Sequence, residues 1–346
     1  ENAAAYAEKK INYLWLQQYG TQGLHLENST GYHQLTIKEF DEIIKSPEFS
    51  DVKFVYDADD VAKAVDNTKY LYHPNGISTL FGDSNLTIKK NLPKIIGDKI
   101  FNEAGYAFLA GHDNSENNSY LAVRTGFPSN IHRHSDDFSF EWSEKGQVIF
   151  QDSGRYSYEY NNPLRIFLTS TRAHNTVTIN GLNFPWWGGF KKKDFYEGAI
   201  KQYEGDGEKV NLVLEKDFSS LGVKFNRSLE LVRGKSLKIT DTLRSQSENK
   251  YEQWFHLAEE FEYSGEVENA KLKFDSDKFS VIIHPPEGAE VLVVKGQEEP
   301  FIQGWVSYKE KKVTPRWSFG FIKSGPGRVE FSTEFEVTEC LVEEGE

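Results

Sequence analysis

Residues 210–239 read VNLVLEKDFSSLGVKFNRSLELVRGKSLKI, and they show the fold class of this chain most clearly. Three runs rich in apolar residues, Val210–Leu214, Ser228–Val232 and Ser236–Ile239, are separated by glycine, asparagine, aspartate and serine. Similar runs recur from about Glu103 onward. They are Ala104–Leu109, Tyr120–Thr125, Gln147–Gln151, Asn175–Ile179, Val281–His284 and Arg316–Ile322. Many short strands with evenly spaced turn residues predict an all-β sandwich rather than alternating strands and helices.

The first hundred or so residues have a helical pattern instead. Ala3–Gln18 places its apolar residues on one face of a helix, and Leu35–Lys45 repeats that spacing. Asp59–Tyr70 begins with acidic residues, which suit a helix N-terminus. We therefore predict an α+β multidomain chain, with a helical part over residues 1–97 and a large antiparallel β-sandwich over residues 98–346.

Composition narrows the possible functions. The net charge of −13 over 346 residues argues against nucleic-acid binding, although a local basic cluster can still bind an acidic sugar. No apolar run reaches the roughly 20 residues that a membrane span needs. The single cysteine, Cys340, excludes an internal disulfide framework, and we expect it to be a buried thiol. The chain begins at Glu1 without methionine, so we expect a fragment or processed piece whose start indicates no compartment.

Three β segments concentrate residues that can carry chemistry. Asn130–Phe140 contains His132 and His134, which on an extended strand would project to the same face. Asp152 follows an apolar strand, and His174 is expected to begin another. Each alone has an ordinary interpretation, as surface histidines, a turn aspartate or a structural histidine. Together, two histidines and one carboxylate form a ligand set that zinc accepts, which leaves one histidine for chemistry.

These segments closely resemble the heparinase II/III-like polysaccharide lyases, in matching order over roughly residues 20 to 185. The matching motifs are Glu27-Asn28-Ser29-Thr30-Gly31-Tyr32-His33, the Gly82-Asp83 loop, His132-Arg133-His134-Ser135-Asp136, Asp152-Ser153-Gly154 and Ala173-His174-Asn175-Thr176-Val177. The resemblance implies that residues 1 to about 97 are the end of an incomplete α/α toroid, packed beside the β-sandwich. It also favours a periplasmic or secreted protein.

The resemblance implies roles for five residues. Tyr32 would be the Brønsted acid and base of a β-elimination on an acidic, uronic-acid-containing polysaccharide, and His132 its partner. Zinc would be held by His134, Asp152 and His174, mainly to fix the loops of the sandwich. The family's Asn or His that neutralises the substrate carboxylate lies further upstream than the 31 residues preceding Tyr32, so we expect it outside this chain.

Further residues are candidates for substrate contact: Glu27, Asn28, His33, Arg165, Trp186 and Trp187. The tryptophans could stack on sugar rings while Lys191, Lys192 and Lys193 face an acidic polymer, or this loop could simply pack on the sandwich with a solvated charge run. A tyrosine ordinarily titrates near pH ~10, so the base needs cationic neighbours. Candidates for that help are His132, Arg133 and Arg165 or Arg172.

Two other function classes remain open at this point. A zinc hydrolase would use metal-bound water, but no HExxH-like helix supplies a glutamate base. A non-catalytic glycan-binding module would bind the polysaccharide without turnover. The product separates these classes, because a lyase leaves a conjugated unsaturated sugar and a hydrolase does not.

Overall fold

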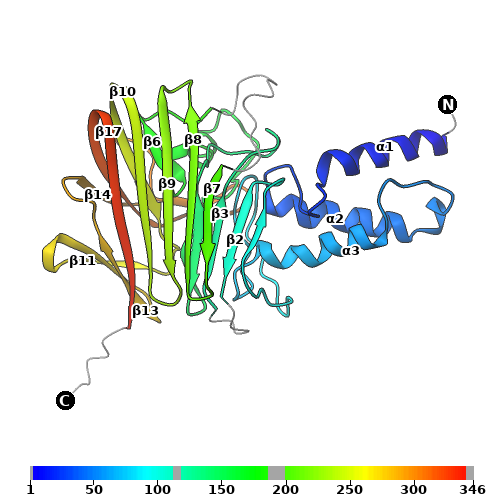
Figure 1. The fold of residues 1–346 in the computed structure, drawn as a ribbon, viewed down its shortest axis with the longest axis horizontal. Helices are drawn as coiled ribbons and strands as arrows, with labels where there is room; N and C mark the ends of the chain where they lie inside the picture. The colour runs from blue at the N-terminus through cyan, green and yellow to red at the C-terminus, as the bar shows by residue number, and fades with distance from the viewer. Residues whose placement is uncertain (1–2, 112–117, 186–198, 340–346) are drawn as a thin grey trace, which may run out of the picture.

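The computed structural model describes residues 3–111, 118–185 and 199–339, and shows a helical arm beside two antiparallel sheets (Figure 1). This confirms the predicted fold class of helices followed by a large antiparallel β-sandwich. The division at residues 97 and 98 stays a prediction. Trp186, Trp187, Lys191, Lys192, Lys193 and Cys340 lie outside the described residues. No helix within the described ranges is long and apolar enough to cross a membrane.

The helical arm contains three helices, α1 (Ala3–Gln18), α2 (Thr30–Lys45) and α3 (Ala58–Asn67). Helix α2 begins earlier than the predicted Leu35 because the Ser29 side chain caps it, accepting from the backbone N–H of Tyr32. Two 3₁₀ turns follow α2 and α3, at Pro47–Phe49 and Thr68–Leu71. Stacked and edge-on aromatic rings hold the arm together, namely Trp15, Tyr19, Phe40 and Tyr56.

The first sheet has five strands in sequence order, all antiparallel. They are β1 (Lys99–Phe101), β2 (Tyr106–Ala110), β3 (Tyr120–Arg124), β4 (Phe140–Glu144) and β5 (Gln147–Phe150). Helix α4 (Pro163–Leu168) and the 3₁₀ turn Thr171–Ala173 follow this sheet in the chain and lead into the second. A separate hairpin pairs β15 (Trp305–Lys309) with β16 (Lys312–Pro315).

The second sheet has ten strands in the order β11-β12-β13-β17-β10-β9-β8-β7, with β14 paired to β17 and β6 to β10. Its strands are β6 (Val177–Ile179), β7 (Ile200–Gly205), β8 (Lys209–Phe218), β9 (Val223–Val232), β10 (Ser236–His256), β11 (Glu262–Val267), β12 (Lys271–Asp275), β13 (Phe279–His284), β14 (Glu290–Lys295) and β17 (Trp317–Glu339). A 3₁₀ turn, Glu268–Ala270, joins β11 to β12.

Two of these strands are far longer than the short runs predicted. β10 has 21 residues and β17 has 23, and they pair from Ser236↔Glu336 to His256↔Ser318. A register shift between Ser245 and Asn249 interrupts the ladder. The polar residues at this irregularity break the apolar pattern in the sequence, which is why only the start of β10 was predicted.

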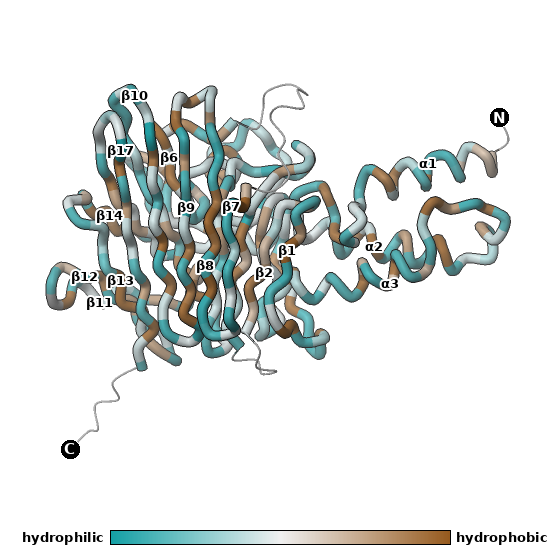
Figure 2. Tube along the Cα trace, in the orientation of Figure 1, coloured by the Kyte–Doolittle hydropathy of each residue, from teal (hydrophilic) through white to brown (hydrophobic). Residues whose placement is uncertain are grey.

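The main core lies between the two sheets. It joins residues such as Leu121 and Trp142 of the first sheet to Leu229 and Phe319 of the second. The opposite face of the first sheet is also buried, because Phe108 and its neighbours pack against the end of the helical arm. Strands β2 and β3 are therefore buried on both faces. Along β8 and β9 apolar residues are interspersed with polar ones (Figure 2). This packing fixes the arm against the sandwich where the candidate site lies.

Candidate active site and metal centre

The loop that carries the two histidines replaces the extended strand expected from the sequence. Residues 131–139 form turns and irregular backbone, and His132 adopts φ +54°. The strand expected at His174 likewise begins only at Val177. Because the loop turns at His132, neighbouring elements rather than strand pleating set the directions of the two imidazoles.

Gly82 allows this loop to approach the helical arm closely. It has φ +62°, and a Cβ at this position would lie 2.6 Å from the carbonyl oxygen of His132. The next residue, Asp83, donates its backbone N–H to that same carbonyl at 3.1 Å. Asn28 holds the loop from the other side, donating its amide to the carbonyls of Ser129 and Ile131 at 2.8 and 2.9 Å. Only glycine tolerates this conformation and spacing, so the motif positions the histidine loop.

Tyr32 and His132 meet face to face. Tyr32 lies in the first turn of α2, and its ring stacks on the His132 imidazole with centroids 3.6 Å apart and planes inclined by 12°. The Tyr32 hydroxyl lies 2.9 Å from the hydroxyl of Tyr158. His132 Nε2 lies 3.7 Å from a carboxylate oxygen of Glu27. The structure therefore brings together the two residues predicted as a catalytic pair.

The carboxylate of Asp83 links His132 of this pair to two buried side chains, His134 and Arg165. Its Oδ2 lies 3.2 Å from His132 Nδ1, while its Oδ1 lies 3.1 Å from His134 Nε2 and 2.6 Å from Arg165 Nη1. Burial acts to raise the pKa of Asp83, but hydrogen bonds from His132 and His134 and the charge of Arg165 hold it well below its usual range. Asp83 is therefore an ionised carboxylate that accepts from three donors.

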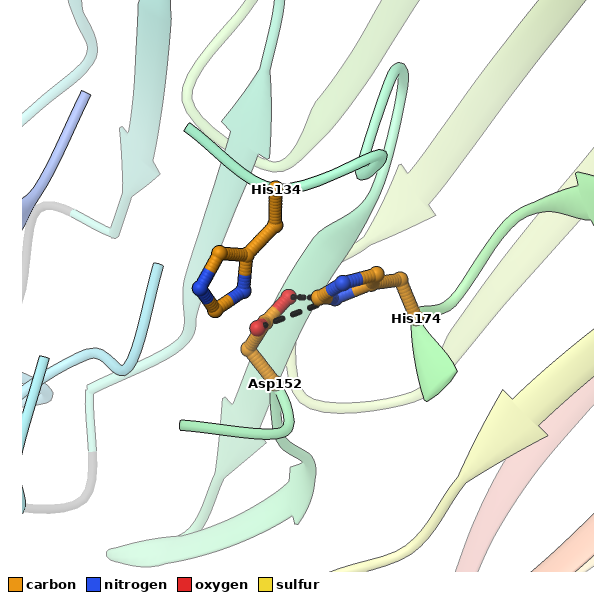
Figure 3. A group of neighbouring side chains, drawn as sticks. All are labelled: His134, Asp152 and His174. Carbon is orange, nitrogen blue, oxygen red and sulfur yellow. Dashed lines mark hydrogen bonds and ion pairs between the residues drawn. The ribbon is translucent and has the colours of Figure 1, made fainter. Parts of the chain in front are cut away.

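His134, Asp152 and His174 form a possible metal-binding group (Figure 3). Each offers one ligand atom, these atoms all lie within 4.8 Å of one another, and the three side chains point toward one another from different segments. His174 Nδ1 lies 3.0 and 3.1 Å from the two carboxylate oxygens of Asp152. All three residues are fully buried.

The donor set fits a divalent metal such as zinc. Two imidazoles and a carboxylate are common zinc ligands. Nδ1 of His134 is buried and has no hydrogen-bond partner among the described residues, while its Nε2 contacts Asp83. Burial lowers the pKa of His134, which keeps the ring neutral and leaves a lone pair for a metal. Metal-binding histidines usually donate their second ring nitrogen to a carboxylate, and Asp83 lies where it could take that place beside His134.

His33 and Asn28, which were predicted to contact the substrate, make hydrogen bonds inside the protein. His33 is 1% exposed; its Nε2 contacts the carbonyl of Ala64 at 3.0 Å, and its Nδ1 accepts from the backbone of His25. Burial lowers its pKa to about 4, so it is neutral. Asn28 is equally buried and spends its amide on the histidine loop. Neither side chain reaches the surface in this structure, and their contact with substrate stays a prediction.

The three arginines that were candidates to assist the tyrosine base make contacts in different parts of the structure. Arg165 contacts Asp83 and lies 5.6 Å from the ring of Tyr158. Arg172 instead pairs with Glu252 on β10 at 2.9 Å, so it serves the second sheet. Arg133 stacks on the ring of Phe127 at 3.8 Å. Of these, Arg165 is the cation joined to the Tyr32 pair through its contacts.

Sequence reasoning missed Tyr158 and Arg155. The guanidinium of Arg155 lies 4.9 Å from the centre of the Tyr158 ring. Burial, followed by the charge of Asp83, raises the pKa of Tyr158, so it stays protonated and can donate to the oxygen of Tyr32. The cluster of tyrosines after Asp152 was the available signal, but it could not show which ring faces Tyr32.

A cavity of about 230 Å³ opens beside these groups. Its lining includes Asp83, His132, Arg133, Tyr158, Tyr160 and Arg165. A larger cavity of about 380 Å³ lies between Tyr72, Lys89 and Asn118, and none of the predicted site residues lines it. The smaller cavity is therefore the better candidate for the reacting part of a substrate.

The family model described as "Heparinase II/III-like, C-terminal" matches residues 97–336. The chain belongs to the heparinase II/III-like family. The fold is similar to a heparinase III structure, the BT4657 gene product, with a TM-score of 0.81 and 18% identity over 98% of this chain. It is equally similar to the heparan sulfate lyase HepC from Pedobacter heparinus, with a TM-score of 0.80 and 16% identity over 98% of this chain.

This heparinase II/III-like chain spans only part of those proteins. It covers 57% of the length of both solved structures. No curated protein sequence matches it. At these identities the solved structures establish the fold alone, so the residues of this chain must carry the argument for its chemistry.

Proposed function

We propose that this chain is the catalytic-site part of a polysaccharide lyase that cleaves a uronic-acid-containing polysaccharide by β-elimination. The observation that carries the proposal is the stacked pair of Tyr32 and His132, of which His132 lines a cavity together with Arg133 and Arg165. A hydroxyl that can exchange a proton, with guanidinium groups in the wall of the neighbouring cavity, suits a substrate that carries a carboxylate.

The reaction needs one proton removed and one returned. The Tyr32 oxygen, as phenolate, takes the proton from C5 of the uronic acid. The electrons of that C–H bond form the C4–C5 double bond, and the C4–O4 bond breaks. The Tyr32 hydroxyl then returns the proton to the leaving O4, so that no water is consumed. One residue can perform both steps if the hydrogen on C5 and the leaving O4 lie on the same face of the sugar ring.

Tyr158 and His132 contact Tyr32 and can position it for proton transfer. Tyr158 can donate to the Tyr32 oxygen across 2.9 Å, and Arg155 lies over the Tyr158 ring. Such pre-positioned donors stabilise a developing anion more strongly in a cavity than in water. His132 covers the face of the Tyr32 ring and so fixes its direction.

Zinc at His134, Asp152 and His174 would act by holding the loops of the sandwich together. A bound metal can also lower the pKa of water, which is the chemistry of the alternative hydrolase. The burial of all three ligands speaks against that alternative, because the cavity is lined by His132 rather than by these residues. The metal centre therefore supports the site and leaves the proton transfers to side chains.

The test is a screen of acidic polysaccharides with the full-length protein. A lyase produces a conjugated unsaturated uronic acid, so ultraviolet absorbance should rise with cleavage. New reducing ends without new absorbance would indicate the hydrolase. Binding without either product would indicate a glycan-binding protein, and both results contradict the proposal.

A further inference from the structure

The carboxylate of Asp83 contacts the predicted catalytic histidine and a predicted metal ligand at the same time. Oδ2 faces His132 Nδ1 at 3.2 Å, and Oδ1 faces His134 Nε2 at 3.1 Å. Asp83 is 6% exposed and lies in the loop that Gly82 docks against the histidine loop. One buried carboxylate therefore contacts both the proposed catalytic pair, through His132, and the proposed metal centre, through His134.

An ionised carboxylate can only accept hydrogen bonds. Each histidine nitrogen that contacts Asp83 must therefore carry a hydrogen. In a neutral imidazole the other nitrogen is then the acceptor. His132 therefore turns its Nδ1 hydrogen toward Asp83, and His134 keeps Nδ1 as its ligand atom for a metal. The buried Nδ1 of His134, which has no hydrogen-bond partner in the part of the chain that the structure describes, agrees with this assignment.

We propose that Asp83 is a positioning residue that sets the tautomers of both His132 and His134 and so couples the metal centre to the catalytic pair. His134, if it held a metal through Nδ1, would donate its Nε2 hydrogen more strongly and so would anchor Asp83. The anchored carboxylate in turn orients His132, the ring that covers Tyr32. The kinetic consequence rests on the proposed lyase function, whereas the tautomers and the metal affinity do not.

The substitution Asp83→Asn separates the two contacts. The Oδ1 position faces two donors, His134 and Arg165, so the amide oxygen should take that place. The amide nitrogen would then point its hydrogens at His132 Nδ1, which must become an acceptor. We expect the proton of His132 to move to Nε2 while His134 keeps its tautomer and the metal stays bound. An inverted histidine tautomer costs on the order of 10⁴-fold in turnover in a serine protease triad.

The experiment records histidine ¹⁵N spectra of the zinc-loaded, full-length protein, with His132 assigned through a His132→Gln variant. The wild type should show the hydrogen of His132 on Nδ1, and Asp83→Asn should show it on Nε2 with zinc content unchanged. Asp83→Ala should weaken zinc binding about 10- to 100-fold in chelator competition. Asp51→Asn, an exposed site with the same charge change, should alter none of these.

Wild-type His132 with its hydrogen on Nε2 would overturn the proposal without any variant. So would an unchanged His132 spectrum in Asp83→Asn, or zinc affinity equal to wild type in Asp83→Ala. These spectra and affinities need no turnover. A protein that shows the predicted tautomers but cleaves no polysaccharide would thus refute the lyase function alone.

Discussion

Glu144 at the end of β4 should make the stability of the protein fall as pH rises toward neutrality. Its carboxylate is 1% exposed; Oε1 accepts from Ser119 Oγ at 2.6 Å and Trp142 Nε1 at 3.0 Å, and Oε2 accepts from the backbone of Gly234 at 3.1 Å. Burial raises its pKa from 4.5 to about 7 despite these bonds.

The pKa of Glu144 sets the direction and the size of the change in the free energy of unfolding with pH. Between pH 4.5 and about 7 the folded protein holds a proton on Glu144 that the unfolded chain has lost. The free energy of unfolding therefore decreases as pH rises through this window, and Glu144 adds no further change below or above it. A shift of this size corresponds to about 3 kcal/mol, at about 1.4 kcal/mol per pKa unit.

The substitution Glu144→Gln removes the titration and keeps the shape. It also loses one acceptor, because an amide nitrogen cannot accept from its donors, so the variant should be less stable at pH 4.5 by about 1–3 kcal/mol. Urea unfolding followed by tryptophan fluorescence, at several pH values, measures both effects. The wild type should lose about 3 kcal/mol more than the variant between pH 4.5 and 7.5.

The matched control is Glu248→Gln, an exposed glutamate on β10 with the same change in charge. Its pH profile should run parallel to that of the wild type. If the profile of Glu144→Gln also runs parallel to the wild type, Glu144 is ionised in the folded protein and the reasoning from burial is refuted.

Three further predictions concern the site and the core. Tyr32→Phe should keep the unfolding transition and abolish elimination, and His132→Ala should do the same without releasing metal; near-normal turnover of Tyr32→Phe would contradict its role. His174→Ala should remove close to one equivalent of metal by elemental analysis and lower the unfolding midpoint, since metal binding is partly folding energy; full metal content would contradict the ligand set. Asp241→Ala leaves the buried guanidinium of Arg227 without its partner at 2.6 Å; it should cost about 3–5 kcal/mol in urea unfolding, and a loss under 1 kcal/mol would show that the charge is solvated.

Local sequence patterns predicted much of the fold. The apolar spacing of Ala3–Gln18 gave helix α1 with its bounds, and the run Tyr120–Thr125 gave strand β3. These features depend on side chains a few residues apart, which a sequence displays directly. The length of β10 could not be predicted from the local pattern. Its polar residues have no strand pattern of their own and are held in the strand by pairing with β17.

The site followed from motifs, but its geometry did not. The spacing of His132 and His134 suggested two imidazoles on one strand face, whereas the structure directs both at Asp83 from a turning loop. That contact spans 49 residues to His132, and the contact of Tyr158 with Tyr32 spans 126. Such convergence depends on how the arm docks on the sandwich, which local periodicity does not encode.

The packing role of His33 shows the same limit. Its position beside Tyr32 in the motif suggested substrate contact, but neighbours on a helix point about 100° apart. Tyr32 consequently stacks on His132, while His33 faces the interior of the arm and contacts Ala64. A motif match therefore does not show which of two neighbouring residues faces the candidate site and which is buried in the arm.

The central claim is elimination rather than hydrolysis, and the fate of water tests it most directly. The full-length protein digests an acidic polysaccharide in water enriched in the heavy oxygen isotope ¹⁸O, and mass spectrometry measures the masses of the products. Elimination by Tyr32 predicts that one product is lighter by one water than the saturated sugar and that cleavage adds no heavy oxygen. Saturated products that carry one heavy oxygen for each bond cleaved would show hydrolysis and contradict the account.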